Sequence, residues 1–223
     1  MKKFSKLVCS CFVASVFIMI ALGCASQKTF TYDICLTSVE APADAKEQFG
    51  ETKVISFTDQ ASSLTKYSYE DDFIAITWYV NSEQFNFTLK NKTQHTIKIN
   101  WDDISYVNYN GYTQRMMHAG VKYIDRNASQ PSTMIPKGAT ISDLLQPTDN
   151  VYWIDATRYN SGRWAATPLI PNTYNNEVTP ASVASQYIGK TMTILMPIYI
   201  ENVQNDYMFN FCINAYKVPK KKR

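Results

Sequence analysis

Hydrophobic and polar residues alternate along most of this chain, which is the period-two pattern of β-strands with one face in a core. From Phe30 to Leu36 every second residue is hydrophobic, and smaller or polar residues lie between. Residues 74–80 are apolar on both faces, which predicts a strand buried on both sides. The same alternation recurs in residues 85–89, 97–101, 140–145, 191–201 and 207–218.

Turn-forming residues separate these segments and predict which strands are neighbours. Residues 91–94 (Asn-Lys-Thr-Gln) predict an antiparallel hairpin between 85–89 and 97–101. Asn110-Gly111 predicts a tight hairpin in which both residues adopt positive φ. A closing hairpin is expected around residues 202–206, with Pro197 at an edge or a bulge because proline lacks the ladder donor.

Helix signals are few and short. They cover residues 43–49, opened by Pro42, and residues 181–188, preceded by Thr179 and Pro180. Many short strands and few helices predict an all-β fold, an antiparallel β-sandwich of immunoglobulin-like or related type with one or two short helices. No repeat or flexible linker divides the chain. We therefore expect a signal in residues 1–23, a single domain in 24–218 and a basic tail in 219–223.

The composition fits a folded domain that is exported. Of 223 residues 45% are hydrophobic and 18% charged, which excludes a disordered chain. The first 23 residues contain three lysines and no acid, followed by an apolar run from Leu7 to Leu22. This run is shorter than the roughly 18–20 residues that cross a bilayer, so a cleaved export signal is expected in place of a membrane anchor helix.

Two cleavage sites are open at the end of this signal. Ala21-Leu22-Gly23-Cys24 resembles the lipobox of bacterial lipoproteins, in which the cysteine carries the lipid. The resemblance implies lipidation of Cys24. The alternative is cleavage by ordinary signal peptidase after Ala25, which would release a soluble exported protein.

After the signal and Cys24, two cysteines remain, Cys35 and Cys212. Two thiols in an exported protein can pair with each other and leave none over. The alternative is two buried reduced thiols, since sequence alone cannot show that their Cβ atoms meet.

The charge balance argues against nucleic acid as a partner. Of the 22 Lys and Arg residues, 19 follow the signal, against 19 Asp and Glu. Five of these 19 cations lie in the last seven residues, so the body of the domain carries an excess of acids. A phosphate-binding face needs cations clustered on the fold itself.

Several segments between residues 85 and 148 form a recognisable set. They are Asn91-Lys92-Thr93, Ile97-Lys98-Ile99-Asn100-Trp101-Asp102, Gly111, His118-Ala119-Gly120 and Ile135-Pro136-Lys137-Gly138. Together with the signal, this set resembles uncharacterised envelope lipoproteins of Bacteroidetes type. The resemblance implies a β-rich lipoprotein domain and supplies no catalytic residues.

Residues suited to catalysis or metal binding are sparse. Neither His95 nor His118 has a nucleophile or an orienting acid in its local sequence, so no catalytic site is predicted. The acids at 70–72 and 102–103 lack the spacing of a calcium loop and are expected at solvated strand ends. No Cys/His spacing indicates zinc, and no cofactor is expected.

Aromatic residues interleaved with amides and arginines fill residues 150–176. Flat rings beside planar hydrogen-bond donors could hold a sugar or peptide, although the same rings could pin a long loop onto the domain. The candidate ligand-binding residues are Trp153, Tyr159, Arg163, Trp164 and Tyr174.

These observations favour a non-catalytic lipoprotein of the cell envelope that acts as a binding or assembly module. Its expected partners are a membrane, through the lipid, and a glycan or another envelope protein. Ala25 follows Cys24 where aspartate would favour the inner membrane, so the outer membrane is expected. The alternative is a surface glycan-binding or adhesive module that uses the aromatic residues of 150–176.

Overall fold

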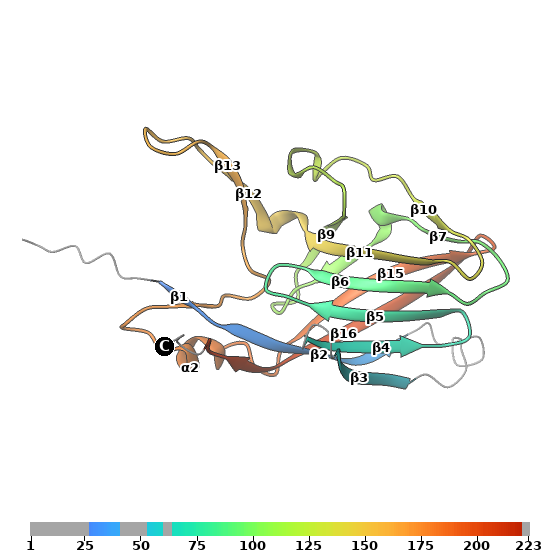
Figure 1. Cartoon of the computed structure of the whole chain (residues 1–223), viewed down its shortest axis with the longest axis horizontal. Coiled ribbons are helices and arrows are strands. Elements are labelled where there is room, and N and C mark those ends of the chain that lie inside the picture. Colours follow the sequence, from blue (N-terminus) through green and yellow to red (C-terminus); the bar gives the residue numbers. More distant parts are fainter. Residues whose placement is uncertain (1–26, 41–52, 60–63, 220–223) are drawn as a thin grey trace, which may run out of the picture.

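The computed structural model of the chain describes residues 27–40, 53–59 and 64–219 (Figure 1). The predicted signal, Cys24, the helix at 43–49 and residues 220–223 lie outside this part. The strands are β1 (Lys28–Thr29), β2 (Thr31–Glu40), β3 (Lys53–Asp59), β4 (Leu64–Glu70), β5 (Ile74–Val80), β6 (Phe85–Asn91), β7 (Ile97–Ile99), β8 (Ser105–Val107), β9 (Thr113–His118), β10 (Thr133–Ile135), β11 (Thr140–Pro147), β12 (Val151–Ile154), β13 (Arg163–Ala166), β14 (Thr173–Tyr174), β15 (Thr191–Ile200) and β16 (Val203–Lys217). The helical elements are η1 (Trp101–Asp103), η2 (Tyr123–Asp125), η3 (Thr148–Asn150) and α2 (Pro180–Ala184).

Twelve of the strands form one antiparallel sheet. Its main order is β10-β7-β15-β8-β9-β11-β6-β5-β4-β3, with β16 beside β15 and β2 beside β16. The prediction of an all-β antiparallel fold is therefore confirmed, but a sandwich of two separate sheets is not. The strand β9 explains the difference, because it pairs with β8 on one side and with β11 on the other and so joins the two halves.

The sheet curls until its two halves face each other across one core (Figure 1). The first half contains β3, β4, β5, β6 and β11, and the second contains β2, β16, β15, β7 and β10. Aromatic side chains meet between them, with ring centroids 5.0 Å apart for Trp78 and Phe209 and 5.1 Å apart for Phe85 and Phe211. Along β2, next to β3 and β4, the halves approach without ladder pairing, and we call this line the seam.

The predicted hairpin between residues 85–89 and 97–101 is wrong. The strand β6 pairs with β5 and β11, whereas β7 lies in the other half and pairs with β10 and β15. The buried side chain of Asn91 fixes the crossing, since its amide donates to the carbonyls of His95 at 2.7 Å and Ile135 at 2.9 Å. These bonds direct the chain toward β10 instead of back along β6.

The β8–β9 and β15–β16 hairpins form as predicted, but the conformation or position of each turn differs from the prediction. Asn110-Gly111 does join a hairpin, between β8 and β9, but of these two residues only Gly111 has positive φ. The last two strands pair through a tight turn at Glu201 and Asn202, with φ of 49° and 68°, so β16 starts earlier than expected. Pro197 lies in an interior strand, not at an edge.

A gap in the sheet accommodates Pro197. On one side of β15, β8 pairs with residues 193–195 and β7 with residues 198–200. Pro197 falls between these two short strands, at a position where neither requires a donor. Its missing amide therefore breaks no ladder hydrogen bond on that side.

Asp71, expected at a solvated strand end, is instead buried between the halves. Its carboxylate accepts from the backbone amides of Phe73 and Ile74 at 2.8 Å each. It also accepts from the hydroxyls of Tyr69 at 3.1 Å and Tyr207 at 2.9 Å. One carboxylate thus ties the β4–β5 turn to β16.

Asp102 forms a second polar tie, between η1 and the loop that precedes β10. It accepts from the hydroxyl of Ser129 at 2.6 Å, the amide of Gln130 at 3.1 Å and the guanidinium of Arg115. The Ser129 hydrogen bond, followed by those from Gln130 and Arg115, holds the pKa of Asp102 below its usual range, although partial burial opposes the shift.

Asp102→Asn should lower the free energy of unfolding by about 1–2 kcal/mol at pH 7. A folded-state pKa below the unfolded one contributes stability that is present above about pH 4 and is lost as the pH falls through the folded pKa. Urea unfolding at pH 7 and pH 3 should therefore show the gap between variant and parent narrowing at pH 3. An equal gap at both pH values would contradict this role of the charge.

Candidate functional site

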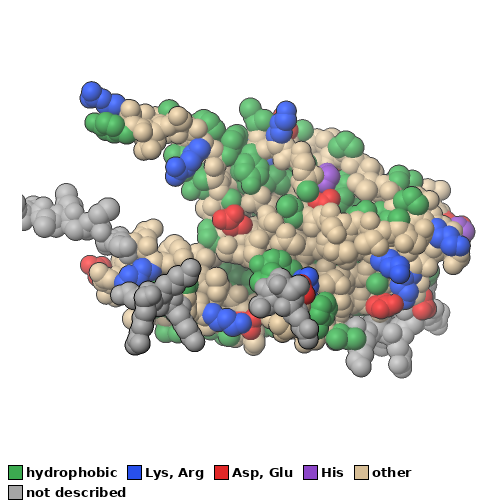
Figure 2. Space-filling view, viewed as in Figure 1, with side chains coloured by type: hydrophobic (Ala, Val, Ile, Leu, Met, Phe, Trp, Pro, Cys, Tyr) green, Lys and Arg blue, Asp and Glu red, His purple; other side chains and the backbone are tan. Residues whose placement is uncertain are grey.

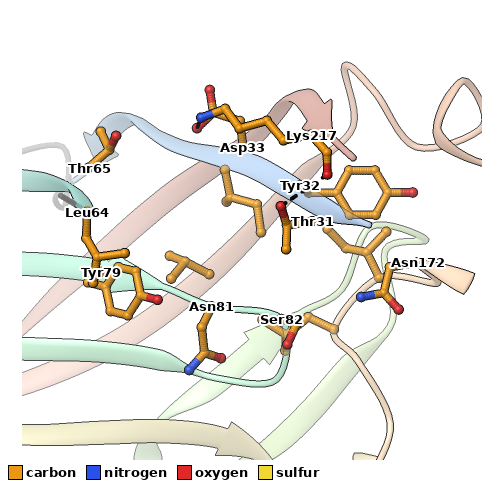
Figure 3. A pocket seen from close by; sticks show the side chains of 14 residues that line it. Thr31, Tyr32, Asp33, Leu64, Thr65, Tyr79, Asn81, Ser82, Asn172 and Lys217 are labelled. Atoms are coloured by element: carbon orange, nitrogen blue, oxygen red, sulfur yellow. Dashed lines mark hydrogen bonds and ion pairs between the residues drawn. The ribbon is translucent and has the colours of Figure 1, made fainter. Parts of the chain in front are cut away.

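A hollow lies beside the seam, at the end of the body where β2 begins. It is a cavity of about 310 Å³ bounded by the first half of β2, the start of β4, the end of β5 with the following turn, and residues 169–172 (Figure 3). We call it the seam pocket. A volume of this size falls at the lower end of the range typical for small-ligand sites.

The walls of the seam pocket combine apolar and neutral polar groups. Ile34, Leu169 and Ile170 are buried core residues that form an apolar side. The other groups are mostly hydroxyls and amides, and one ion pair, Asp33 with Lys217 at 3.5 Å, adds no net charge. The polar residues that line it are Thr31, Thr65, Tyr79, Asn81, Ser82 and Asn172. This lining suits a small uncharged ligand with one apolar face.

Asn172 is the most unusual residue of the pocket. Its side chain is 7% exposed, and Oδ1 has no hydrogen-bond partner among the described residues. The backbone holds the residue in place, because its carbonyl accepts from the amide of Phe30 at 3.0 Å. A buried acceptor without a partner costs roughly 1–3 kcal/mol, so this oxygen lowers the stability of the fold at the edge of the cavity.

Tyr32 strengthens the same wall. Its hydroxyl donates to the carbonyl of Pro171 at 3.0 Å, which ties β2 to the segment that carries Asn172. Burial, with smaller contributions from Tyr187 and Tyr109, raises the pKa of Tyr32. The hydroxyl therefore remains a neutral donor at physiological pH.

A second candidate surface is the hairpin of β12 and β13, residues 151–166, which we call the arm. It projects from the body in Figure 1, and Figure 2 shows hydrophobic and cationic side chains gathered on it. Trp153 and Trp164 are cross-strand partners whose rings meet edge to face at 5.5 Å. Trp153 is 49% exposed and Tyr159, near the tip, is 85% exposed.

The structure places four of the five predicted ligand residues on the arm. Trp153, Tyr159 and Arg163 are exposed there, whereas Trp164 is half-buried and lies under the guanidinium of Arg126 at 5.1 Å. Tyr174 is elsewhere, in β14, where its ring contacts Phe30 and lies 5.9 Å from Lys28 Nζ. These five residues therefore do not form one continuous platform.

Cys35 and Cys212 are brought together, since they lie directly opposite each other in the β2–β16 ladder. Both are free thiols in this structure, and Cys35 Sγ donates to the Cys212 carbonyl at 3.5 Å. Burial, followed by the nearby Cys212 and Asp33, raises the pKa of Cys35. Residues directly opposite in a ladder have Cβ atoms close to disulfide range, so the bridge stays a prediction compatible with this register.

The two histidines each contact an acid. His118 Nδ1 lies 3.2 Å from Asp143, with its ring stacked on Trp101 at 4.1 Å, and His95 lies 2.9 Å from Glu201. Within residues 27–40, 53–59 and 64–219, no hydrogen bond joins either imidazole to a serine, threonine or cysteine side chain. The same residues contain no group of three His, Cys, Asp or Glu placed to hold a metal ion.

Comparisons with family models, with curated proteins and with solved structures found no match for the chain. None of the helices among the described residues has the length and apolar character to span a bilayer. Sequence analysis missed the seam pocket, because its lining comes from widely separated segments. One feature of the sequence could have pointed to this pocket. Asn172 follows closely after Leu169 and Ile170, so a polar amide lies next to residues that are buried in the core.

Proposed function

We propose that the chain is a non-catalytic lipoprotein of the bacterial cell envelope whose β-domain binds a small ligand in the seam pocket. The signal and Cys24 support the anchor, and the outer membrane is the expected location. The seam pocket carries the binding role. Its lining has no net charge, is apolar on one side and includes a buried oxygen of Asn172 that has no hydrogen-bond partner among the described residues, which is suited to holding a small neutral ligand.

The observation that carries this proposal is the buried amide of Asn172 at the edge of a cavity. The core does not need a polar side chain at that position, and an unpartnered oxygen lowers the stability of the folded state. A ligand hydroxyl or N–H group that reaches Asn172 would recover this free energy. Ligand binding would therefore account for a buried polar side chain at position 172 that does not stabilise the fold.

Filling the pocket should abolish ligand binding without unfolding the domain. Ser82→Trp introduces a bulky ring from the exposed turn after β5 into the pocket mouth, whereas Glu83→Trp places the same ring on the neighbouring residue, outside the lining. Native mass spectrometry of the chain purified from the envelope should show a small bound species in the parent and in Glu83→Trp, reduced at least tenfold in Ser82→Trp.

The two tryptophan variants share the added bulk and the turn, so a difference between them reports on the pocket alone. Matching thermal melts would establish that both are folded. A bound species retained equally by both variants, or found in neither the parent nor the variants, would contradict a ligand-binding role for the seam pocket.

The glycan-binding or adhesive module stays a second prediction. One observation favours it, the exposure of Trp153 and Tyr159 on the projecting arm, since sugar rings stack on such faces. The separation of Tyr174 from the arm removes one of the five residues on which this interpretation depends.

A further inference from the structure

The arm leaves the body at the same end at which the described chain begins (Figure 1). The chain enters the fold through β1, which pairs with β14 at Lys28 and Tyr174. Cys24 precedes Lys28 by four residues, a stretch that spans at most about 14 Å when extended. A lipid on Cys24 would therefore hold this end of the body, and with it the base of the arm, close to the membrane.

The side chains of the arm suit the boundary between lipid and water. Tyr152, Trp153 and Tyr159 are exposed large aromatic residues, a type that concentrates where one end of the ring is apolar and the other is hydrated. Arg158 and Arg163 are also exposed. With Asp155 as the one acid in residues 151–166, the arm carries a net positive charge and complements an anionic surface.

Trp153 is held in its exposed position by its neighbours. Its ring packs edge to face against Trp164, which in turn contacts Tyr123 with ring centroids 6.1 Å apart. Gly162 lies under the same ring, because a Cβ at that position would come within 2.4 Å of Trp153 Cζ2. The indole is thus preorganised on the arm and not collapsed onto the body.

We propose that the arm is a membrane-contact site, in which Trp153 and Tyr159 enter the headgroup region and Arg158 and Arg163 bind the phosphates of anionic lipids. The proposal rests on the proposed anchoring through Cys24, since that anchor brings the arm to the bilayer. With two attachment points, lipid and arm, the body would have a fixed orientation on the membrane instead of swinging on a single tether.

The test uses the mature chain, residues 24–223, with Cys24→Ser so that no acyl chain contributes. Co-sedimentation with vesicles of phosphatidylcholine mixed with phosphatidylglycerol should exceed that with phosphatidylcholine alone. The double variant Trp153→Ala and Tyr159→Ala should lose at least tenfold in affinity. Arg158→Ala and Arg163→Ala should each lose roughly fivefold, and more salt should weaken binding.

Matched controls come from the opposite end of the body in Figure 1, near β10. Met134 is an exposed apolar residue of β10 and Lys137 an exposed cation in the loop after it. Met134→Ala and Lys137→Ala should leave vesicle binding unchanged. Equal losses in these controls, or no binding of the unlipidated parent to anionic vesicles, would overturn the proposal.

Two further outcomes separate the arm from its alternatives. If arm variants remove a signal on a glycan array while vesicle binding is unchanged, the arm is a glycan site and the membrane proposal fails. Mass spectrometry of the native N-terminus tests the anchor independently. An unmodified N-terminus would remove the anchor on which the proposal rests, whereas the vesicle result on unlipidated chain reports on the arm alone.

Discussion

Asp71→Ala should lower the free energy of unfolding by roughly 3–5 kcal/mol, because it removes a buried carboxylate that accepts four hydrogen bonds. Asp71 is 5% exposed. Without it the hydroxyl of Tyr69 and two backbone amides of the β4–β5 turn lose their acceptor, and the contact from that turn to Tyr207 on β16 is broken.

Both phenols are locked in the neutral form that donates. Burial, followed by the charge of Asp71, raises the pKa values of Tyr69 and Tyr207. At neutral and moderately alkaline pH these hydroxyls therefore remain neutral donors. The loss in Asp71→Ala should persist from neutral to moderately alkaline pH.

Urea unfolding measures this effect, with Asp72→Ala as the matched control. Asp72 is the adjacent carboxylate and is exposed, so its replacement should change the free energy of unfolding by less than about 0.5 kcal/mol. Similar losses for Asp71→Ala and Asp72→Ala would show that the buried network does not stabilise the fold as described.

Trp78→Ala should destabilise the domain by about 3–5 kcal/mol, since it empties the centre of the core. The indole is fully buried and lies between the two halves of the sheet, with ring centroids 5.2 Å from Phe87, 5.0 Å from Phe209 and 5.5 Å from Phe211. Removal of the ring leaves a cavity that strands on both sides can fill only in part.

Trp78→Phe offers a sharper comparison. The indole Nε1 is buried without a hydrogen-bond partner among the described residues, so phenylalanine removes an unsatisfied donor while retaining most of the apolar surface. We expect a loss of at most half that of Trp78→Ala, measured by thermal or urea unfolding. The exposed Trp153→Ala serves as a control, with a loss below about 1 kcal/mol. A larger loss in Trp78→Phe than in Trp78→Ala would contradict this account.

The sequence pattern predicted most strands because their alternation reflects one buried face, as in β5, where Ile74, Ile76 and Trp78 are fully buried. The pattern did not predict correctly which strands are connected as neighbours. Residues 91–94 have the composition of a hairpin turn, yet the hydrogen bond from the side chain of Asn91 to the carbonyl of Ile135 directs the chain across the fold. That outcome depends on a residue 44 positions away and leaves no local signal.

In the candidate site too, local sequence features were predictable and contacts between distant residues were not. The aromatic residues of 150–176 were compatible with a ligand surface or with a loop pinned onto the domain, and the sequence did not predict the two-stranded arm in which Trp153 pairs with Trp164. The acid at Asp71 was expected in solvent, because sequence shows a charge but not the two phenols that surround it. The seam pocket was invisible for a related reason, since it is lined by hydroxyls and amides that any surface could carry.

The pairing of β2 with β16 sets the order in which the fold can be completed. The hydroxyl of Thr37 donates to the carbonyl of Asn210, 173 positions later, so β2 has no ladder partner until nearly the whole chain is present. Contacts of such separation slow folding, and an unmatched strand is prone to associate with other chains in the meantime. Truncation near residue 203 would leave β2 without the strand with which it pairs.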